Sequence, residues 1–210
     1  MYFVLFPSSS PKPLTLTNAK VVSPVRAGVS LAGRWTIAPG SVAGYRVREK
    51  LGFLPAPSDA VGRTSQISGT ATLTQAGTVV TIATSTFRVA VNTLKSNETM
   101  RDQHIQTIGL QSATYPTATF TQSAALRLPA GALDGRVART SVSGALTLHG
   151  TTRTVTIPLQ VGLSASRLHA AGSITFPWGE FHMTAPSVGG FVSVTAHATM
   201  EFDLRLVRGR

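Results

Sequence analysis

Residues 192–206, VSVTAHATMEFDLRL, alternate between apolar and polar side chains along their whole length. Every even position from Val192 to Leu206 is apolar, and every odd position from Ser193 to Arg205 is polar. Successive side chains of a β-strand point to opposite faces, so the pattern predicts one strand with a buried and a solvated face. At about 3.4 Å per residue such a strand reaches roughly 50 Å, so we expect a tall sheet that twists or bends strongly.

Residues 143–162, SGALTLHGTTRTVTIPLQVG, predict a hairpin with the same alternation. The turn is expected at residues 149–153, where Gly150 supplies the flexible position that a hairpin needs. Further alternating runs cover residues 43–50, 66–74, 78–89, 118–126 and 167–176, which brings the total to about eight strands. The fold class is therefore all-β, and eight antiparallel strands close most simply into an extended up-and-down barrel. A β-sandwich is the competing architecture.

One segment, KSNETMRDQHIQTIGL at residues 95–110, departs from the alternation. It begins with the cap-prone residues Ser96 and Asn97, places apolar residues at roughly helical spacing and ends at Gly109. We expect a short helix over residues 97–108 that crosses outside the sheet or over one of its ends.

The composition excludes several kinds of chemistry. The 210 residues include no cysteine, so neither a disulfide framework nor a thiolate site is available. The five histidines lack the spacing of common zinc motifs, and no nucleotide-binding or hydrolase motif occurs. We therefore expect no metal and no cofactor.

The charge is strongly basic, with 19 Lys and Arg against 8 Asp and Glu, which gives +11. Such a field favours anionic partners, including nucleic acid and acidic membrane surfaces. No nucleic-acid-binding module accompanies it, so nucleic acid is not an expected partner. The basic residues are scattered apart from Arg46, Arg48 and Lys50, which we predict to make transient contact with an anionic membrane.

The first 33 residues lack the periodicity of the rest and are rich in Pro and Ser. The start, MYFVLFPSSSPKPLTLT, has neither the charged region nor the apolar length of a secretory signal. We interpret residues 1–33 as a linker or the remnant of an N-terminal membrane anchor, and residues 34–210 as the barrel domain. Deletion of the linker is expected to leave the stability unchanged.

The apolar face of three strands is bulky toward the ends and small in the middle. The strands are residues 142–146, 168–176 and 194–202, whose small members are glycine or alanine. An eight-stranded barrel is just wide enough to be filled by side chains or to hold one small ligand. Small inward residues favour an elongated apolar cavity, and a tightly packed or sharply bent barrel is the alternative.

Several motifs resemble, in order and spacing, those of the YceI-like family. They are WTI at 35–37, RDQHI at 101–105, YPTATF at 115–120, GALTLHGTTRTVT at 144–156 and WGEF at 178–181. The stretch GYRVREKL at 44–51 is similar to the actinobacterial branch. Pro177 stands where the family usually has an acidic residue, so a role for that acid is not carried over.

The resemblance implies a lipocalin-like barrel whose apolar interior binds a long isoprenoid, such as a polyprenyl lipid or an isoprenoid quinone. It also implies an extracytoplasmic setting, either periplasmic, in the cell envelope or secreted. Members of the branch commonly carry a membrane-spanning segment before the barrel.

The expected ligand contacts fall into two sets. The tunnel set faces the barrel interior and comprises Val142, Gly144, Leu146, Leu148, Val155, Ile157, Leu159, Ala170, Gly172, Ile174, Phe176, Val194, Ala196, Ala198, Met200 and Phe202. The mouth set is placed near the ligand's polar head and comprises Arg101, Asp102, His104, Tyr115, Phe120, Trp178 and Phe181. For Arg101 and Asp102 the alternative is a structural pair that fixes the helix to the barrel.

These observations predict non-catalytic binding, storage or transport of an extended apolar lipid, with an isoprenoid lipid or quinone as the partner. One alternative is a secreted structural or stress-related module with a filled barrel. Another is an enzyme that uses Arg101, Asp102 and His104. Association into a homodimer is left open.

Overall fold

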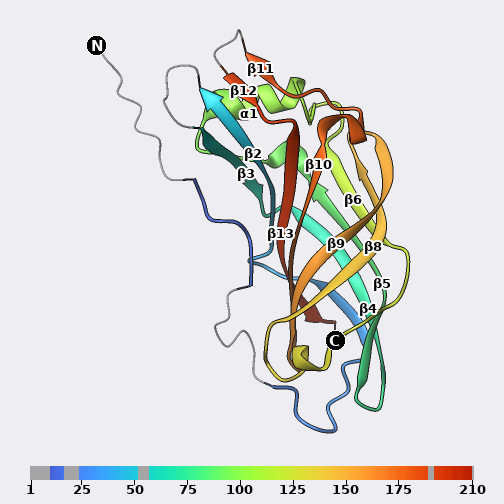
Figure 1. Cartoon of the computed structure of the whole chain (residues 1–210). Helices are drawn as coiled ribbons and strands as arrows, with labels where there is room; N and C mark the ends of the chain where they lie inside the picture. The colour runs from blue at the N-terminus through green and yellow to red at the C-terminus, as the bar shows by residue number, and fades with distance from the viewer. Residues whose placement is uncertain (1–9, 17–23, 52–56, 189–191, 210) are drawn as a thin grey trace.

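The fold is a closed antiparallel β-barrel with one α-helix at one end (Figure 1). The computed structural model describes residues 10–16, 24–51, 57–188 and 192–209. Around the barrel the strands follow the order β1-β4-β5-β6-β8-β9-β10-β13, and β1 pairs with β13 to close the circle. The prediction of an eight-stranded antiparallel barrel with one short helix is confirmed, and a sandwich is excluded because the circle is closed.

The strands are β1 (Gly33–Ile37), β2 (Val42–Leu51), β3 (Ser58–Thr64), β4 (Ile67–Ala76), β5 (Val79–Ala90), β6 (Thr117–Gln122), β7 (Leu126–Arg127), β8 (Ala138–Leu148), β9 (Thr151–Leu163), β10 (Arg167–Pro177), β11 (Ser187–Val188), β12 (Val192–Val194) and β13 (His197–Arg208). The helix α1 spans Thr99–Thr107, and 3₁₀ turns lie at η1 (Val91–Thr93), η2 (Ala130–Ala132) and η3 (Trp178–Phe181).

The β8–β9 hairpin turns through only two residues, His149 and Gly150, rather than through the five expected. Both have positive φ, 50° and 69°, which is the backbone of a type I′ turn and matches the twist of the strands. A Cβ on Gly150 would lie 2.8 Å from the ring of Tyr115, so this position also requires glycine for space.

The fifteen-residue strand predicted at 192–206 is wrong in one respect, because it is interrupted at residues 195–196. β12 pairs with β2 and with β11, whereas β13 pairs with β2 and β10. The indole of Trp178 donates a hydrogen bond to the Thr195 carbonyl at 2.8 Å, and the Trp178 amide donates to the Ala196 carbonyl at 3.4 Å. These bonds take up carbonyls that a continuous ladder would use.

Strand β3 is absent from the sequence prediction. It pairs with β2 from Glu49↔Ser58 to Ala43↔Thr64 and extends the barrel wall toward α1. Gly and Pro in the run GFLPAPSDAVG hid its alternation.

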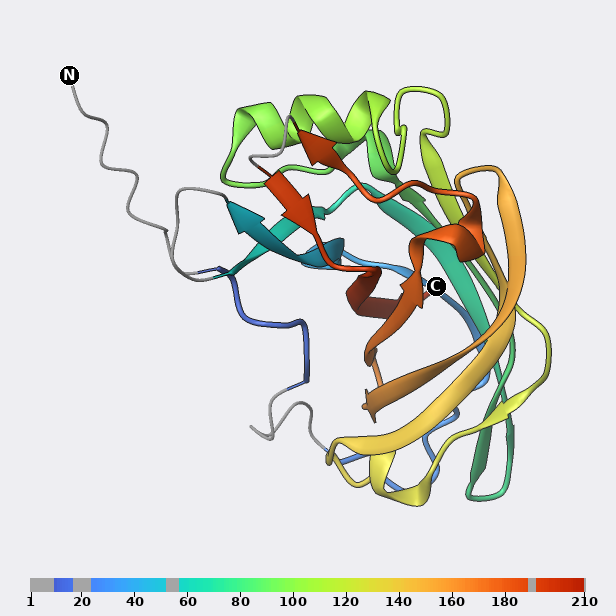
Figure 2. The same cartoon turned by 45° about the horizontal axis from the view of Figure 1, so that its top comes forward.

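Helix α1 lies over one end of the barrel, as Figure 2 shows. Its bounds, Thr99–Thr107, fall within the predicted range of 97–108. Only Asp102 of the helix is buried, and Ile105 is the half-buried apolar residue that packs α1 against the core.

The core forms two apolar clusters along the barrel axis. The cluster near α1 includes Val47, Leu94, Phe176 and Phe181. The cluster at the opposite end is centred on Trp35, which is fully buried and donates its indole N–H to the Leu31 carbonyl at 3.0 Å. A barrel closed at both ends by packed side chains leaves its free volume in the middle.

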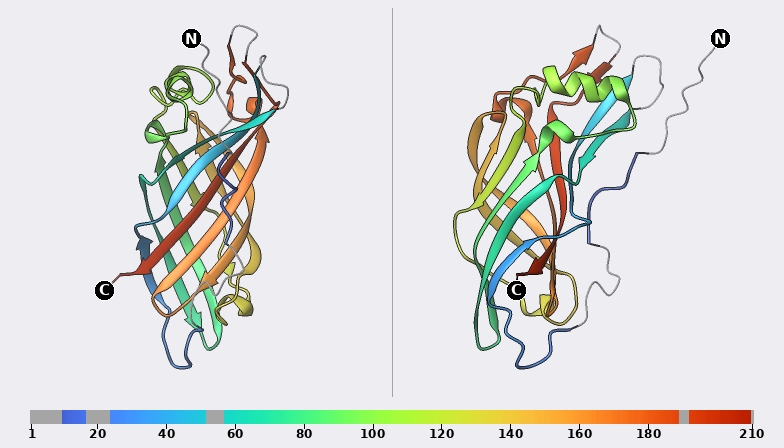
Figure 3. Two further views of the ribbon diagram at one scale, coloured as in Figure 1. Left: turned by 90° about the vertical axis from the view of Figure 1, so that its left-hand side faces the viewer. Right: turned by 180° about the vertical axis from the view of Figure 1, so that it is seen from behind.

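Part of the predicted N-terminal linker lies along the outside of the barrel (Figure 3). Leu16 and Leu31 are buried, with 7% and 0% exposure. The Leu16 amide donates to Gln160 Oε1 at 2.7 Å, and the Leu31 amide donates to Gln75 Oε1 at 2.7 Å. Residues 1–9 and 17–23 of this region are outside the described residues, and no described helix has the length and apolar character to cross a membrane.

Candidate ligand-binding cavity

A cavity of about 110 Å³ lies inside the barrel. Its lining is almost entirely apolar and comprises Ala43, Ile67, Ala71, Ile82, Ser85, Phe87, Val89, Ala118, Thr119, Phe120, Gln122, Leu126, Val142, Leu146, Ile157, Leu159, Leu168, Ala170, Ile174, Met200, Glu201, Phe202, Leu204 and Leu206. These residues come from β2, β4, β5, β6, β7, β8, β9, β10 and β13, so strands from all around the barrel contribute to the cavity.

Half of the predicted tunnel set lines this cavity, as does Phe120 of the mouth set. The tunnel members are Val142, Leu146, Ile157, Leu159, Ala170, Ile174, Met200 and Phe202. Four others, Leu148, Val155, Phe176 and Ala198, are buried in the cluster near α1, and Val194 packs against it half-buried. The alternation therefore predicts which side chains face the barrel interior, but not where along the barrel axis the cavity lies.

Ala196 does not face the interior, so its place in the tunnel set is wrong. It lies in the interruption between β12 and β13 and is exposed. The strict alternation of sequence through this point hid the change in backbone course.

The inward glycines do not leave free space, contrary to expectation, because aromatic rings lie over them. A Cβ on Gly144 would come within 2.5 Å of the Phe120 ring, and one on Gly172 within 2.8 Å of the Phe202 ring. This cross-strand pairing of an aromatic ring with a glycine pins the register of neighbouring strands. The small side chains that border the cavity are alanines instead, including Ala170.

Strand β5 contains a β-bulge that the sequence analysis missed. Thr72 pairs with Thr84 and Leu73 with Ile82, so Ala83 is an extra residue. An extra residue re-aims the side chains that follow it, and Ser85 and Phe87 thereby join Val80 and Ile82 on the inward face. The sequence does carry a signal, since the apolar positions of this run change from even to odd after Ile82.

Arg101 and Asp102 fix α1 to the barrel and do not reach the cavity. Arg101 Nη2 donates to Glu49 Oε1 at 2.6 Å, forming an ion pair on the inner face of β2. The buried Asp102 carboxylate accepts hydrogen bonds from both the amide and the hydroxyl of Ser96, each at 2.8 Å. The arrangement corresponds to the structural alternative for these two residues.

Tyr45 lies beneath this polar group and is held against Gly62, where a Cβ would come within 2.2 Å of its ring. Burial of the phenol is the main reason that its pKa rises to about 12. The Arg101 charge opposes the rise, and the carboxylates of Asp102 and Glu49 add to it. Tyr45 is therefore neutral at physiological pH and cannot serve there as a base.

The remaining mouth residues lie at the α1 end of the barrel. Phe181 is fully buried and packs edge-on against Phe176 with ring centroids 4.8 Å apart. Its carbonyl accepts a hydrogen bond from His149 Nδ1 at 3.1 Å, and the His149 ring lies 4.3 Å from that of Tyr115. His104 is half-buried on α1 and reaches none of these groups. Trp178 and Phe181 close the barrel end rather than line the cavity.

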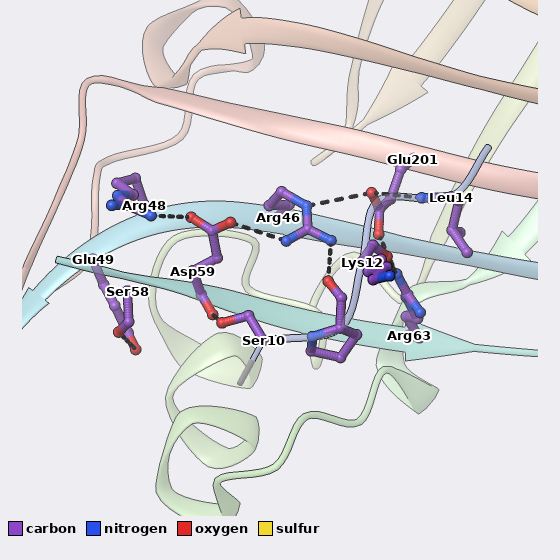
Figure 4. A network of polar contacts seen from close by, with 11 residues as sticks. Ser10, Lys12, Leu14, Arg46, Arg48, Glu49, Ser58, Asp59, Arg63 and Glu201 are labelled. Atoms are coloured by element: carbon purple, nitrogen blue, oxygen red, sulfur yellow. Dashed lines mark hydrogen bonds and ion pairs between the residues drawn. The ribbon is translucent and has the colours of Figure 1, made fainter. Parts of the chain in front are cut away.

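The basic group predicted for membrane contact is largely neutralised by ion pairs (Figure 4). Arg46 pairs with Asp59 at 3.0 Å and with Glu201 at 3.5 Å, and Arg48 pairs with Asp59 at 3.0 Å. Burial alone would raise the pKa of Asp59, but the hydrogen bonds from Arg48 and Arg46 outweigh it and lower the pKa below its usual value. The proposed role of this group in membrane contact is not supported.

Glu201 is the centre of the same network. Its side chain is 2% exposed and accepts from Arg63 Nη2 at 2.9 Å and from the Leu14 amide at 3.3 Å. Arg46 and Arg63 also donate to the carbonyls of Pro11 and Lys12. The segment 10–16, which we call the N-terminal strap, thus covers an ion-pair network on the outer face of β2, β3 and β13.

Within the described part of the chain, no group of three or more His, Asp or Glu side chains is placed to hold a metal ion.

A closed eight-stranded barrel around an apolar cavity defines the class of lipocalin-like binding barrels. The chain belongs to the YceI-like family, whose domain model matches residues 35–206. No curated protein matches the chain.

Solved structures share this fold at low sequence identity. A polyisoprenoid-binding domain from Saccharophagus degradans, implicated in plant cell wall breakdown, is 17% identical with a TM-score of 0.60, covering 85% of this chain and 99% of that one. Burkholderia cenocepacia BcnA is 18% identical with a TM-score of 0.54, covering 78% and 95%. A mutant of the Campylobacter jejuni YceI protein with a monobromobimane guest is 12% identical with a TM-score of 0.53, covering 71% and 85%.

Proposed function

We propose that this protein binds an extended apolar lipid, an isoprenoid chain, inside the barrel and carries or stores it without chemical change. The observation that carries the proposal is the cavity of about 110 Å³ with its apolar lining from nine strands. The polyisoprenoid-binding function of the Saccharophagus domain, which has the same fold, supports this choice of ligand.

The lining must adjust to admit such a chain. A dry apolar cavity of ~150 Å³ holds one benzene molecule, so about 110 Å³ accommodates only a short part of an isoprenoid. Phe87, Phe120 and Phe202 face the cavity and are only half-buried. These rings lie over glycine backbone, and we propose that they turn aside to enlarge the cavity when the lipid enters.

A catalytic function is less well supported by the same residues. Arg101 and Asp102 are engaged with Glu49 and Ser96, and His104 contributes no contact to a shared site. A nucleophile, a base and a group that orients the base must lie within hydrogen-bond reach of one another. The proposed role is therefore binding.

Ala170→Phe is expected to abolish lipid retention, because Ala170 is half-buried and borders the free volume of the cavity. Lipid that copurifies with the wild-type protein would be extracted and identified by mass spectrometry, and its molar ratio to protein compared with that of the variant. Ala196→Phe is the matched control, since Ala196 is exposed outside the cavity, and it should retain the wild-type ratio. Equal retention by both variants would place the ligand elsewhere.

We further propose delivery at an anionic membrane by the barrel end opposite α1. Eight exposed arginines lie on strand ends and loops at this end: Arg26, Arg34, Arg127, Arg136, Arg139, Arg167, Arg205 and Arg208. All five ion pairs among the described residues use Arg46, Arg48, Arg63 or Arg101 instead. The pKa of His169 at this end is lowered mainly by burial, with Arg205 and Arg167 adding to the shift and Asp203 opposing it.

Replacing Arg127 and Arg139 with glutamate is expected to weaken binding to anionic vesicles. Each basic residue near such a surface contributes ~1 kcal/mol, within a Debye length of about 8 Å at physiological salt. Co-sedimentation with vesicles of anionic or neutral lipid, at low and high salt, measures this. The pair Lys50→Glu and Lys95→Glu makes the same charge change at the other end, and the proposal fails if both double variants bind alike.

We also propose that the protein acts outside the cytoplasm, as the family resemblance suggests. The proposed ligand is a polyprenyl lipid or an isoprenoid quinone. Association into a homodimer stays a prediction.

A further inference from the structure

The barrel wall is interrupted beside the cavity, where β5 passes from its pairing with β7 to its pairing with β6. β5 pairs with β6 from Thr86 to Ala90 and with β7 only at Thr81 and Ile82. Residues 83–85 between these ladders include the bulge. At this point the side chain of Gln122 replaces the backbone ladder, because its Nε2 donates to the Ile82 carbonyl at 2.9 Å.

Gln122 and Ser85 form a hydrogen-bonded polar spot in a lining that is mostly apolar. Ser85 is 8% exposed, and its hydroxyl donates to Gln122 Oε1 at 2.8 Å. Gln122 Nε2 also donates to the Ala124 carbonyl at 2.6 Å. Because the carbonyls of Ile82 and Ala124 can only accept, they fix the amide orientation, with Oε1 toward Ser85.

The remaining hydrogen-bonding capacity of this spot consists of acceptors only. Both Gln122 N–H groups and the Ser85 O–H are already used. A hydroxyl oxygen and an amide oxygen each have two lone pairs, so acceptor positions remain on Ser85 Oγ and Gln122 Oε1. A ligand hydroxyl could donate to them without breaking a bond, whereas a ketone, quinone or ether oxygen would compete with Gln122 for the Ser85 proton.

Charge in the lining gives a second restriction. Among the residues that the structure describes, no lysine or arginine lines the cavity. Glu201 is the one charged lining residue in this part of the chain, and its carboxylate is turned outward into ion pairs with Arg46 and Arg63. An ionised carboxylate or phosphate would be buried here without a cation, which is strongly unfavourable.

We infer that Ser85 and Gln122 select the head group of the ligand, and that the ligand is a neutral apolar chain ending in a hydroxyl. The head lies at the interruption of the wall, and the chain extends inward along Val142, Ile157 and Ala170. The inference rests on the proposed function and adds the ligand's chemical class, an alcohol rather than a quinone or an acid.

The test compares three probes with one ten-carbon isoprenoid chain: geraniol, geranyl methyl ether and geranic acid at pH 8. Calorimetric titration of the full chain should give about two- to tenfold tighter binding of geraniol than of the ether, the effect of one net hydrogen bond. Geranic acid should bind most weakly. In the double variant Ser85→Ala with Gln122→Leu, which removes both acceptors, the preference for geraniol over the ether should fall to about one while the ether affinity is kept. Ser173→Ala, which alters an exposed serine on β10, should keep the preference.

The outcomes separate the two proposals. If geraniol and the ether bind wild-type protein equally, or the double variant keeps the preference, the head-group assignment is wrong while binding of apolar chains stands. If no probe binds, the proposed function itself fails. Because the ether affinity of the double variant reports on an intact barrel, a folding defect is not mistaken for loss of selectivity.

Discussion

Glu201→Ala is expected to lower the free energy of unfolding by about 2–4 kcal/mol. Removing one partner of a buried ion pair leaves uncompensated charge and costs roughly 3–5 kcal/mol. The loss here should be somewhat smaller because the side chains of Arg46 and Arg63 retain 14% and 27% exposure. The Leu14 amide would also lose its acceptor.

Denaturant titration followed by circular dichroism measures this loss, provided that the transition is two-state. Glu98→Ala is the control, because Glu98 is exposed and in none of the five ion pairs; its effect should stay within about 0.5 kcal/mol. A loss below 1 kcal/mol for Glu201→Ala would show that the network contributes little to stability.

A chain that begins at Gly33 is expected to be less stable than the full chain by about 3–6 kcal/mol. Burial of a leucine side chain contributes roughly 1.5–3 kcal/mol, and this truncation removes both Leu16 and Leu31. It also deprives the Trp35 indole of its acceptor. In a protein of this size the loss corresponds to a fall in Tm of roughly 10–20 °C.

The matched control is a chain that begins at Ser10, which keeps every contact described for the strap. Thermal unfolding of the two truncated chains separates the contribution of residues 10–32 from that of the preceding residues. Because these leucines are buried, we no longer expect that the N-terminal region can be deleted without loss of stability. An unchanged Tm for the chain that begins at Gly33 would show that the region is dispensable after all.

Local alternation predicted the barrel because each half-buried strand carries its own period-two pattern. The same signal could not show where free volume lies, since that depends on rings from neighbouring strands, such as Phe120 over Gly144. Ala196 was misplaced because the strand is interrupted there. The hydrogen bonds that accompany the interruption come from Trp178, which directly follows β10. Ser85 was missed because a bulge shifts alternation by one residue.

The ion pairs of the basic group at residues 46–50 could not be predicted from the sequence for a similar reason. Arg46 and Arg48 are an isolated basic group in the sequence, but Asp59 on β3 and Glu201 on β13 lie beside them in the barrel. Ion pairs of this kind join residues distant in sequence, and composition carries no information about them. The location of the positive charge without ion-pair partners therefore became visible only once the strands were placed.

Strand β13 connects distant parts of the chain, since it pairs with β1, β2 and β10. Its Glu201 also meets Leu14, which is 187 residues earlier. During synthesis the earlier strands therefore emerge before the partner that completes them, and contacts over such separations form slowly. Until β13 arrives, β1, β2 and β10 present unpaired edges that can associate with other chains. A nascent or C-terminally shortened chain thus carries an aggregation risk that the finished barrel does not.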